Sequence, residues 1–178
     1  MIVVETKRLR LIAATLETLV AEGHDRERLS ALLGAAVPAE WPPPLNDDDS
    51  LQFWISRLTA QPDAACWAAW YFVRDEADAP RVVIGNGGFK GKPSADGVVE
   101  VGYSLFPQFQ HRGYATEAVA ALIDWAFAHE GVQSIIAETL PDLGASIAVL
   151  HRLGFTQTPE SSEPGVIRFA RRRCAAQP

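Results

Sequence analysis

The chain is organised around residues 107–118, which read PQFQHRGYATEA. An alternating apolar run at residues 99–105 precedes this segment and predicts a β-strand. Apolar residues then recur at helical spacing from Ala115 to Ala126, so we expect a helix to begin here. The first turn of a helix leaves backbone N–H groups without partners, and its dipole favours an anion. Because Gly113 would let a diphosphate approach the backbone closely, the segment indicates a phosphate-binding turn.

Three motifs, in order along the chain, resemble those of one family. Gln110–Ala115 is similar to the Q/R-x-x-G-x-G/A signature by which the GNAT acetyltransferases hold the pyrophosphate of acetyl-CoA. Residues 5–11, ETKRLRL, resemble the ET-x-RL-x-L opening of the branch that contains the ribosomal-protein N-terminal acetyltransferases. Residues 145–155, ASIAVLHRLGF, are similar to the S…LGF segment of that branch. The resemblance therefore covers the chain from Glu5 to about Phe155.

This resemblance implies an α+β fold in α/β/α layers. The expected GNAT fold is a mixed, mostly antiparallel sheet of about six to seven strands with a splayed central pair, flanked by helices. It implies a single N-acetyltransferase domain over residues 1–178, in which we expect 172–178 to be a disordered tail. The implied activity is acetyl transfer from acetyl-CoA to a primary amine, of a small molecule or of a protein N-terminus, by direct attack in a ternary complex. The alternative is a non-catalytic acyl-CoA-binding sensor or interaction module on the same fold.

The cosubstrate implied by the resemblance is acetyl-CoA. Its pantetheine arm is expected to pair with the strand before the turn, and a backbone N–H at about Leu105 to bind the oxyanion. The residues expected to bind the cofactor are Ser104, Leu105, Phe106, Gln110, His111, Arg112, Gly113, Tyr114, Ala115, Thr116 and Ser146.

Two carboxylates are candidates for the base that deprotonates the amine. Glu100 and Glu138 each lie within an otherwise apolar strand, where burial would raise the carboxyl pKa towards a useful value. Glu138 matches the strand position that carries a base glutamate in some N-terminal acetyltransferases. An outward-facing strand carboxylate is the simpler interpretation of either residue. An α-amine, with a pKa near ~8, is also partly neutral at pH 7 without any base.

Ser146 is the candidate that assists the departing thiolate. It aligns with the serine that this branch is thought to use near the CoA sulfur, although a serine at a helix start more commonly bonds nearby backbone. Other GNAT branches use a tyrosine, but the matching position here is Leu150. Leu143 stands where the branch has asparagine, so a side chain able to hydrogen-bond cofactor or backbone is missing.

Composition bounds the remaining possibilities. The 178 residues carry a formal charge of −6, which argues against general nucleic-acid binding. No metal-ligand spacing occurs, and Cys66 and Cys174 are far apart, so no metal site is expected. We find no signal-peptide pattern and no apolar run of membrane-spanning length, which favours the cytoplasm and no membrane partner. Exposed sheet edges leave room for a homodimer.

The rest of the chain predicts strands and helices that fit one layered domain. Strands are expected at 8–13, 65–74, 82–90, 98–106, 134–139 and 166–172, and helices at 16–21, 26–33, 51–58 and 144–153. Asp25 and Gly34 are expected to begin and end the second helix. The acidic run 47–49 is best explained by helix capping, with a negative lip for a cationic amine as the alternative.

Overall fold

The computed structural model describes residues 1–173 and contains one eight-stranded sheet in the order β1-β2-β3-β4-β5-β6-β8-β7. All neighbouring strands run antiparallel except β5 and β6. The sheet is therefore mixed and mostly antiparallel, as predicted. The strands are β1 (Val3–Glu5), β2 (Leu9–Ala13), β3 (Ala69–Arg74), β4 (Val82–Phe89), β5 (Val98–Leu105), β6 (Ser134–Thr139), β7 (Thr156–Thr158) and β8 (Ile167–Arg172).

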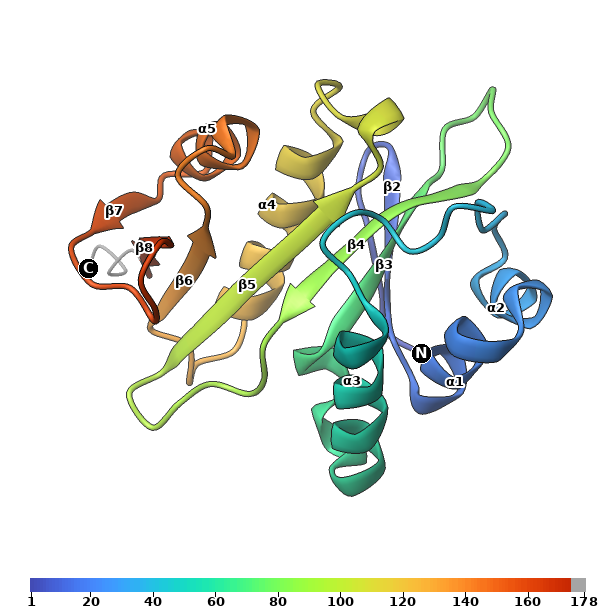
Figure 1. The fold of residues 1–178 in the computed structure, drawn as a ribbon, viewed down its shortest axis with the longest axis horizontal. Coiled ribbons are helices and arrows are strands. Elements are labelled where there is room, and N and C mark those ends of the chain that lie inside the picture. The colour runs from blue at the N-terminus through green and yellow to red at the C-terminus, as the bar shows by residue number, and fades with distance from the viewer. Residues whose placement is uncertain (174–178) are drawn as a thin grey trace.

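Helices cover both faces of the sheet. Figure 1 shows α4 behind β5 and β4, whereas α3 and the segment that leads into it pass in front. One apolar core lies between α4, α5 and the sheet, and a second lies between α1, α2, α3 and the other face. The helices are α1 (Leu16–His24), α2 (Arg26–Leu33), α3 (Asp48–Ala60), α4 (Tyr114–Phe127) and α5 (Gly144–Arg152), with 3-10 turns η1 (Pro62–Trp67) and η2 (Pro107–Phe109). No helix in the described part of the chain is long and apolar enough to cross a bilayer.

The helix ends follow the local sequence signals, as Asp25, Gly34 and Asp47 show. Asp25 accepts a hydrogen bond from the N–H of Arg28 and so caps α2, which Gly34 ends in the left-handed conformation. Asp47 accepts a hydrogen bond from the N–H of Ser50 and caps α3, which confirms the capping interpretation of the acidic run. The two caps therefore fix where α2 and α3 begin.

The parallel pairing of β5 and β6 ends early. It covers three register positions, from Val98 opposite Ser134 to Glu100 opposite Ile136. Antiparallel pairing of β5 with β4 continues to Leu105. The second half of β5 is thus paired on one side only, and Figure 1 shows β6 diverging from it. This is the splayed central pair implied by the resemblance.

Some elements differ from the sequence-based predictions. The two additional strands, β1 and β7, are three residues long and lie at the sheet edges, where they are too short to show an alternating pattern. Residues 62–67 form η1 rather than the start of β3. The predicted disordered tail is wrong at Arg172, which belongs to β8, and at Arg173, which donates to the carbonyls of Val132 and His129. Residues 174–178 lie outside the described part.

Glycines in β4 allow a close approach of the neighbouring strands. A Cβ at Gly87 would lie 2.5 Å from Phe72 Cζ and 2.8 Å from the carbonyl oxygen of Gly102. The register between β3 and β4 shifts between Phe72 and Val73, which is a β-bulge or irregularity. On the facing strand, a Cβ at Gly102 would meet no atom of the described residues within 4 Å.

We predict that Gly87→Ala destabilises the fold by about 1–3 kcal/mol, because its methyl group has no room. Gly102→Ala is the matched control, since the same methyl group meets open space and Ala costs less chain entropy than Gly. Thermal unfolding of the two variants checks this. Equal melting temperatures for both would contradict the close approach.

Candidate active site

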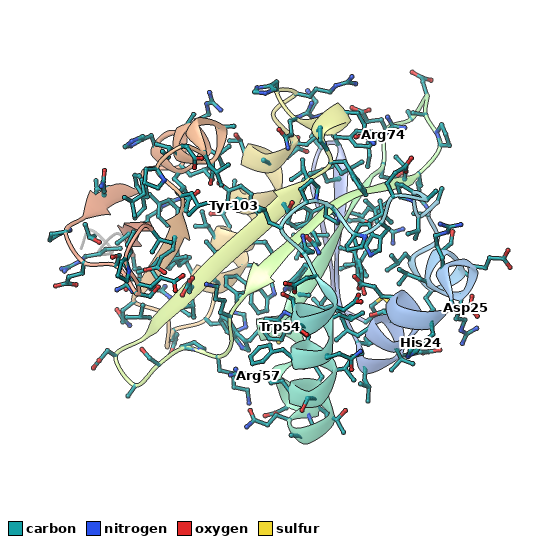
Figure 2. All side chains as sticks on the ribbon, viewed as in Figure 1. His24, Asp25, Trp54, Arg57, Arg74 and Tyr103 are labelled. Atoms are coloured by element: carbon teal, nitrogen blue, oxygen red, sulfur yellow. The ribbon has the colours of Figure 1, made fainter. Side chains whose placement is uncertain are left out.

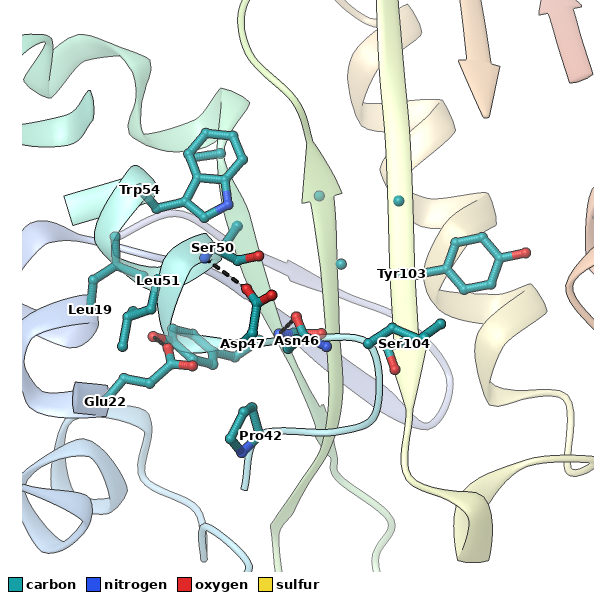
Figure 3. Close-up of a pocket in the computed structure, with 18 of the residues that line it drawn as sticks. Leu19, Glu22, Pro42, Asn46, Asp47, Ser50, Leu51, Trp54, Tyr103 and Ser104 are labelled. Carbon is teal, nitrogen blue, oxygen red and sulfur yellow. Dashed lines mark hydrogen bonds between the residues drawn. The ribbon is translucent and has the colours of Figure 1, made fainter. Parts of the chain in front are cut away.

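Two cavities lie on either side of β5. The larger, of about 650 Å³, lies between β5, β6, α5 and the start of α4. The smaller, of about 390 Å³, lies between β4, β5, α1, α3 and the segment before α3 (Figure 3). Both volumes are in the range of small-molecule sites, roughly 300–1,000 Å³. The cavities share Leu45, Lys90, Gly102, Tyr103 and Ser104, so they meet at the second half of β5.

The backbone of β5 presents free hydrogen-bonding groups to the larger cavity. The Glu100 carbonyl accepts from the N–H of Lys90, and the Phe106 N–H donates to Ile84 on β4. Because backbone groups alternate sides along a strand, those of Val101, Tyr103 and Leu105 point away from β4. Pairing with β6 ends at the Glu100–Ile136 position, so it does not reach Tyr103 or Leu105. An extended ligand could therefore pair with this half of β5 as an added strand.

Within the described chain, the start of α4 leaves backbone N–H groups without partners, as expected for the first turn of a helix. His111 and Gly113 adopt positive φ angles of 59° and 80°, and no side chain of the described residues caps the helix. Within residues 1–173, the N–H groups of residues 111–116 have no backbone or side-chain acceptor. These groups and the helix dipole make the turn suited to an anion. Pyrophosphate fits this chemistry.

A hydrogen-bonded clamp fixes the start of α4. Glu117 accepts bonds from Thr6 Oγ1 at 2.6 Å, from the Arg8 N–H at 2.8 Å and from Arg8 Nε at 2.7 Å. Arg8 also donates to the carbonyl of Arg112 and lies over the Tyr114 ring. Burial raises the pKa of Glu117, but the bonds from Thr6 and Arg8 outweigh it and hold the pKa below its usual value. The ETKRLRL opening thus supports the turn at the start of α4.

Most of the predicted cofactor residues line the larger cavity, but three do not. Tyr114 is buried, and its hydroxyl donates to Glu76 Oε2 at 3.1 Å. Phe106 is buried against Trp41 in an edge-on contact of 6.0 Å between ring centroids. Arg112 also lies outside the lining, so for these three only backbone groups are candidates for the site. The predicted residues in the lining are Ser104, Leu105, Gln110, His111, Gly113, Ala115, Thr116 and Ser146.

Gln110 and Ser104, two of these lining residues, each donate a side-chain hydrogen bond to a backbone carbonyl. Gln110 Nε2 donates to the carbonyl oxygen of Leu105 at 3.0 Å, which ties the turn to the end of β5. Ser104 Oγ donates to the carbonyl oxygen of Pro44 at 2.5 Å, which ties β5 to the proline-rich segment of residues 37–45. These two bonds hold the end of β5 in place, and the N–H of Leu105 points away from β4.

Ser146 and Tyr103 form a hydroxyl pair in the larger cavity. Tyr103 Oη lies 3.2 Å from both the Oγ and the carbonyl oxygen of Ser146. In Figure 3 the Tyr103 ring points away from the smaller cavity. Burial raises the pKa of the Tyr103 phenol, so it keeps its proton at neutral pH. The sequence does not reveal Tyr103 as a site residue, because its contact depends on a residue 43 positions away.

Glu138 lines the larger cavity but is not poised as a base. It accepts hydrogen bonds from the Ser162 N–H at 2.7 Å and from Arg168 Nε at 2.9 Å, and from the Ser162 hydroxyl. Burial raises its pKa, yet the bonds from Ser162 and Arg168 outweigh burial and lower the pKa below its usual value. The prediction that burial would raise it towards a useful value is wrong. Glu138 instead anchors the segment between β7 and β8.

Glu100 lines neither cavity. Its carboxylate pairs with Lys90, which follows the neighbouring strand β4, and its carbonyl accepts the Lys90 N–H. This is the outward-facing strand carboxylate of the simpler interpretation.

Two charged residues with a place in the site carry no signal in the local sequence. Arg152, at the end of α5, lines the larger cavity and donates to Thr116 Oγ1 at 3.3 Å. It puts a positive charge beside the turn at α4. Glu22, in α1, lines the smaller cavity and is partly buried, and desolvation raises its pKa against the opposing bonds from Tyr71 and Trp41. Neither can be distinguished from a surface charge without its distant neighbours.

Comparison with known proteins places the chain in a family. Residues 14–156 match the model of the acetyltransferase (GNAT) domain, and the chain belongs to this family of acetyltransferases. It is 28% identical over 165 residues to the uncharacterized N-acetyltransferase YjdG of Bacillus subtilis, a match that spans 92% of this chain and 95% of that protein.

Solved structures share the fold. The ribosomal-protein-S5-alanine acetyltransferase of Vibrio fischeri has a TM-score of 0.65 at 20% identity, over 100% of both chains. The microcin C7 self-immunity acetyltransferase MccE, solved with acetyl-CoA and AMP, has a TM-score of 0.62 at 16% identity, over 94% of both chains. The expected family and α+β fold are confirmed.

We predict that the Glu138 contacts stabilise the fold in a pH-dependent way. Because the folded pKa lies below the unfolded value of about 4.3, this stability is present above that pH and is lost as the pH falls through the folded pKa. The melting temperature of the wild type should exceed that of Glu138→Gln at pH 7, and the difference should narrow below about pH 4. A difference that is the same at both pH values would contradict the assignment.

Proposed function

We propose that this protein transfers the acetyl group of acetyl-CoA to a primary amine by direct attack in a ternary complex. The observation that carries the proposal is the meeting of two cavities at the half of β5 that β6 leaves unpaired. A cofactor in one cavity and an amine in the other would reach the same short stretch of strand. Such an arrangement holds two reactants close together, which is a major source of rate enhancement.

The chain's own groups fit acetyl-CoA along the larger cavity. The backbone N–H groups of residues 112–116 would hold the pyrophosphate, with Arg152 nearby. The Val101 carbonyl and the backbone groups of Tyr103 lie beyond the last position paired with β6, and they would pair with the amide-bearing arm. Leu143, where the branch has asparagine, lines the same cavity without a polar group. Recognition there would depend on backbone rather than on that side chain.

Two groups would act on the reacting atoms. The N–H of Leu105 points away from β4 and would stabilise the oxyanion that develops on the thioester carbonyl. The Tyr103–Ser146 pair would return a proton to the departing thiolate, with the Tyr103 phenol as the proton-bearing member. Neither role requires a covalent enzyme intermediate.

We predict that Tyr103→Phe and Ser146→Ala each lower kcat about 10- to 100-fold and change the Kd for CoA little, because the hydroxyls act on the leaving group. The double variant should lose less than the product of the single losses, since the two act as one unit. Thiol release from acetyl-CoA with a panel of amines, and calorimetry with CoA, measure these quantities.

The same assay separates the two functional hypotheses. Release of CoA that depends on an added amine supports the transferase. Tight CoA binding without transfer to any amine would instead identify a non-catalytic acyl-CoA sensor. Unchanged kcat in both hydroxyl variants of an active enzyme would exclude their proposed role.

A further inference from the structure

The smaller cavity combines negative charge with aromatic walls. It is lined by the carboxylates of Glu22, Asp47 and Asp48 and by the rings of Trp41, Trp54 and Tyr71, and Lys90 is the one lysine or arginine that the described residues contribute to it. Figure 3 shows Glu22 and Asp47 on one side of the space and Ser104 of β5 on the other. Hydrogen bonds from Ser50 lower the pKa of Asp47, so it is charged at neutral pH. Carboxylates and aromatic faces both attract cations.

Glu22 differs from the other partly buried carboxylates around the site. Glu117 and Glu138 each have an arginine partner, at 2.7 and 2.9 Å. Among the ion pairs of residues 1–173, none involves Glu22. A desolvated carboxylate without a cation is costly, and such groups concentrate at functional sites.

The geometry around Glu22 keeps the carboxylate oriented and leaves it capacity to accept more. Oε1 accepts from Trp41 Nε1 at 2.9 Å, and Oε2 accepts from the Tyr71 hydroxyl at 2.6 Å. Each carboxylate oxygen has a second lone pair. Three segments far apart in sequence, α1, the proline-rich segment and β3, therefore hold one carboxylate at the wall of the cavity.

We propose that the smaller cavity takes a compact primary amine that arrives as an ammonium cation with an apolar body, and that Glu22 binds this cation and accepts its proton. This inference rests on the proposed function and names the acceptor class of the same site. The aromatic rings would contact the apolar body, and the acidic residues would exclude acceptors that carry a carboxylate beside the amine.

The transfer then balances without another reactant. The ammonium gives one proton to the Glu22 carboxylate and becomes a neutral amine. Its lone pair forms the N–C bond at the acetyl carbonyl carbon as the C–S bond breaks. The thiolate takes a proton from the Tyr103–Ser146 pair. The amide nitrogen then loses its extra proton, which restores that pair through water, and Glu22 releases its own proton to water.

The basicity of the acceptor is the reason for a dedicated carboxylate. At pH 7 about one in ten α-amines with a pKa near 8 is neutral, against about one in 2,500 alkylamines with a pKa near 10.4. An enzyme for protein N-termini could manage without a base. A proton-accepting carboxylate at the wall of the acceptor cavity favours the more basic alkylamine.

The test compares Glu22→Gln with Glu17→Gln, a control on the same helix whose carboxylate is exposed and pairs with Arg28. The acceptors are phenethylamine and tryptamine, their amino-acid counterparts phenylalanine and tryptophan, and a short peptide that begins with alanine. Glutamine can keep both hydrogen bonds, accepting from Trp41 and donating to the Tyr71 oxygen. Melting temperature and CoA affinity check the fold of each variant.

We expect wild type and Glu17→Gln to prefer the two amines over the amino acids and the peptide by about 10-fold or more in kcat/KM. Glu22→Gln should lose about 100-fold with those amines. In wild type, log kcat/KM should rise as Glu22 ionises, and this limb should be absent in Glu22→Gln. The other charged or hydrogen-bonding groups around Glu22 are Tyr71 on β3, Trp41 and Asp47 before α3, Asp48 in α3, and Lys90. The Glu22→Gln variant leaves all of these groups in place.

Equal kinetics and pH profiles for Glu22→Gln and Glu17→Gln, or preference for the peptide, would overturn the inference while the transferase activity stands. Absence of CoA release by wild type with every acceptor would overturn the proposed function itself.

If Glu22→Gln does not fold, Gly102→Val replaces it as the test variant. The valine side chain would enter open space on the face of β5 that Ser104 shares. It should lower kcat/KM for the amines at least about 10-fold, and an unchanged value would count against this cavity as the acceptor site.

Discussion

The early end of the β5–β6 pairing is the constraint on which the site depends. Parallel pairing stops at Glu100 and Ile136, while β4 holds β5 as far as Leu105. One strand therefore stays fully supported on one side, with its backbone groups free on the other. The sheet would bury those groups if β6 continued alongside. The gap gives both cavities a common wall, and the start of α4 lies at its end.

Carboxylates shielded from solvent are paired unevenly around this gap, which lies beside Tyr103 of β5 in Figure 2. Arginine partners neutralise Glu117, which fixes the start of α4, and Glu138, which fixes the segment between β7 and β8. Both have a lowered pKa and serve stability. Glu22 has hydrogen bonds but no cation among the described residues, and burial raises its pKa. The fold thus tolerates one unfavourable carboxylate, at the wall of the cavity that we assign to the amine.

The sequence predicts those features whose cause is local. Asp25 begins α2 because its side chain caps the helix, and Gly34 ends α2 because glycine readily adopts the left-handed conformation. Gly113 precedes α4 in the same left-handed conformation. Long-range partners decide the rest. Glu138 is expected from its strand to have a raised pKa, but Arg168 and Ser162 reverse the effect of burial. Glu22 cannot be identified from the sequence, because its environment comes from residues 19 and 49 positions away.

The most direct test of the account is a crystal structure with CoA and an alkylamine bound together. The account predicts the pyrophosphate on the N–H groups at the start of α4, the pantetheine arm along the unpaired half of β5, and the amine nitrogen on the Glu22 side of Gly102. A pyrophosphate bound away from α4, or an amine that enters through the larger cavity, would contradict it.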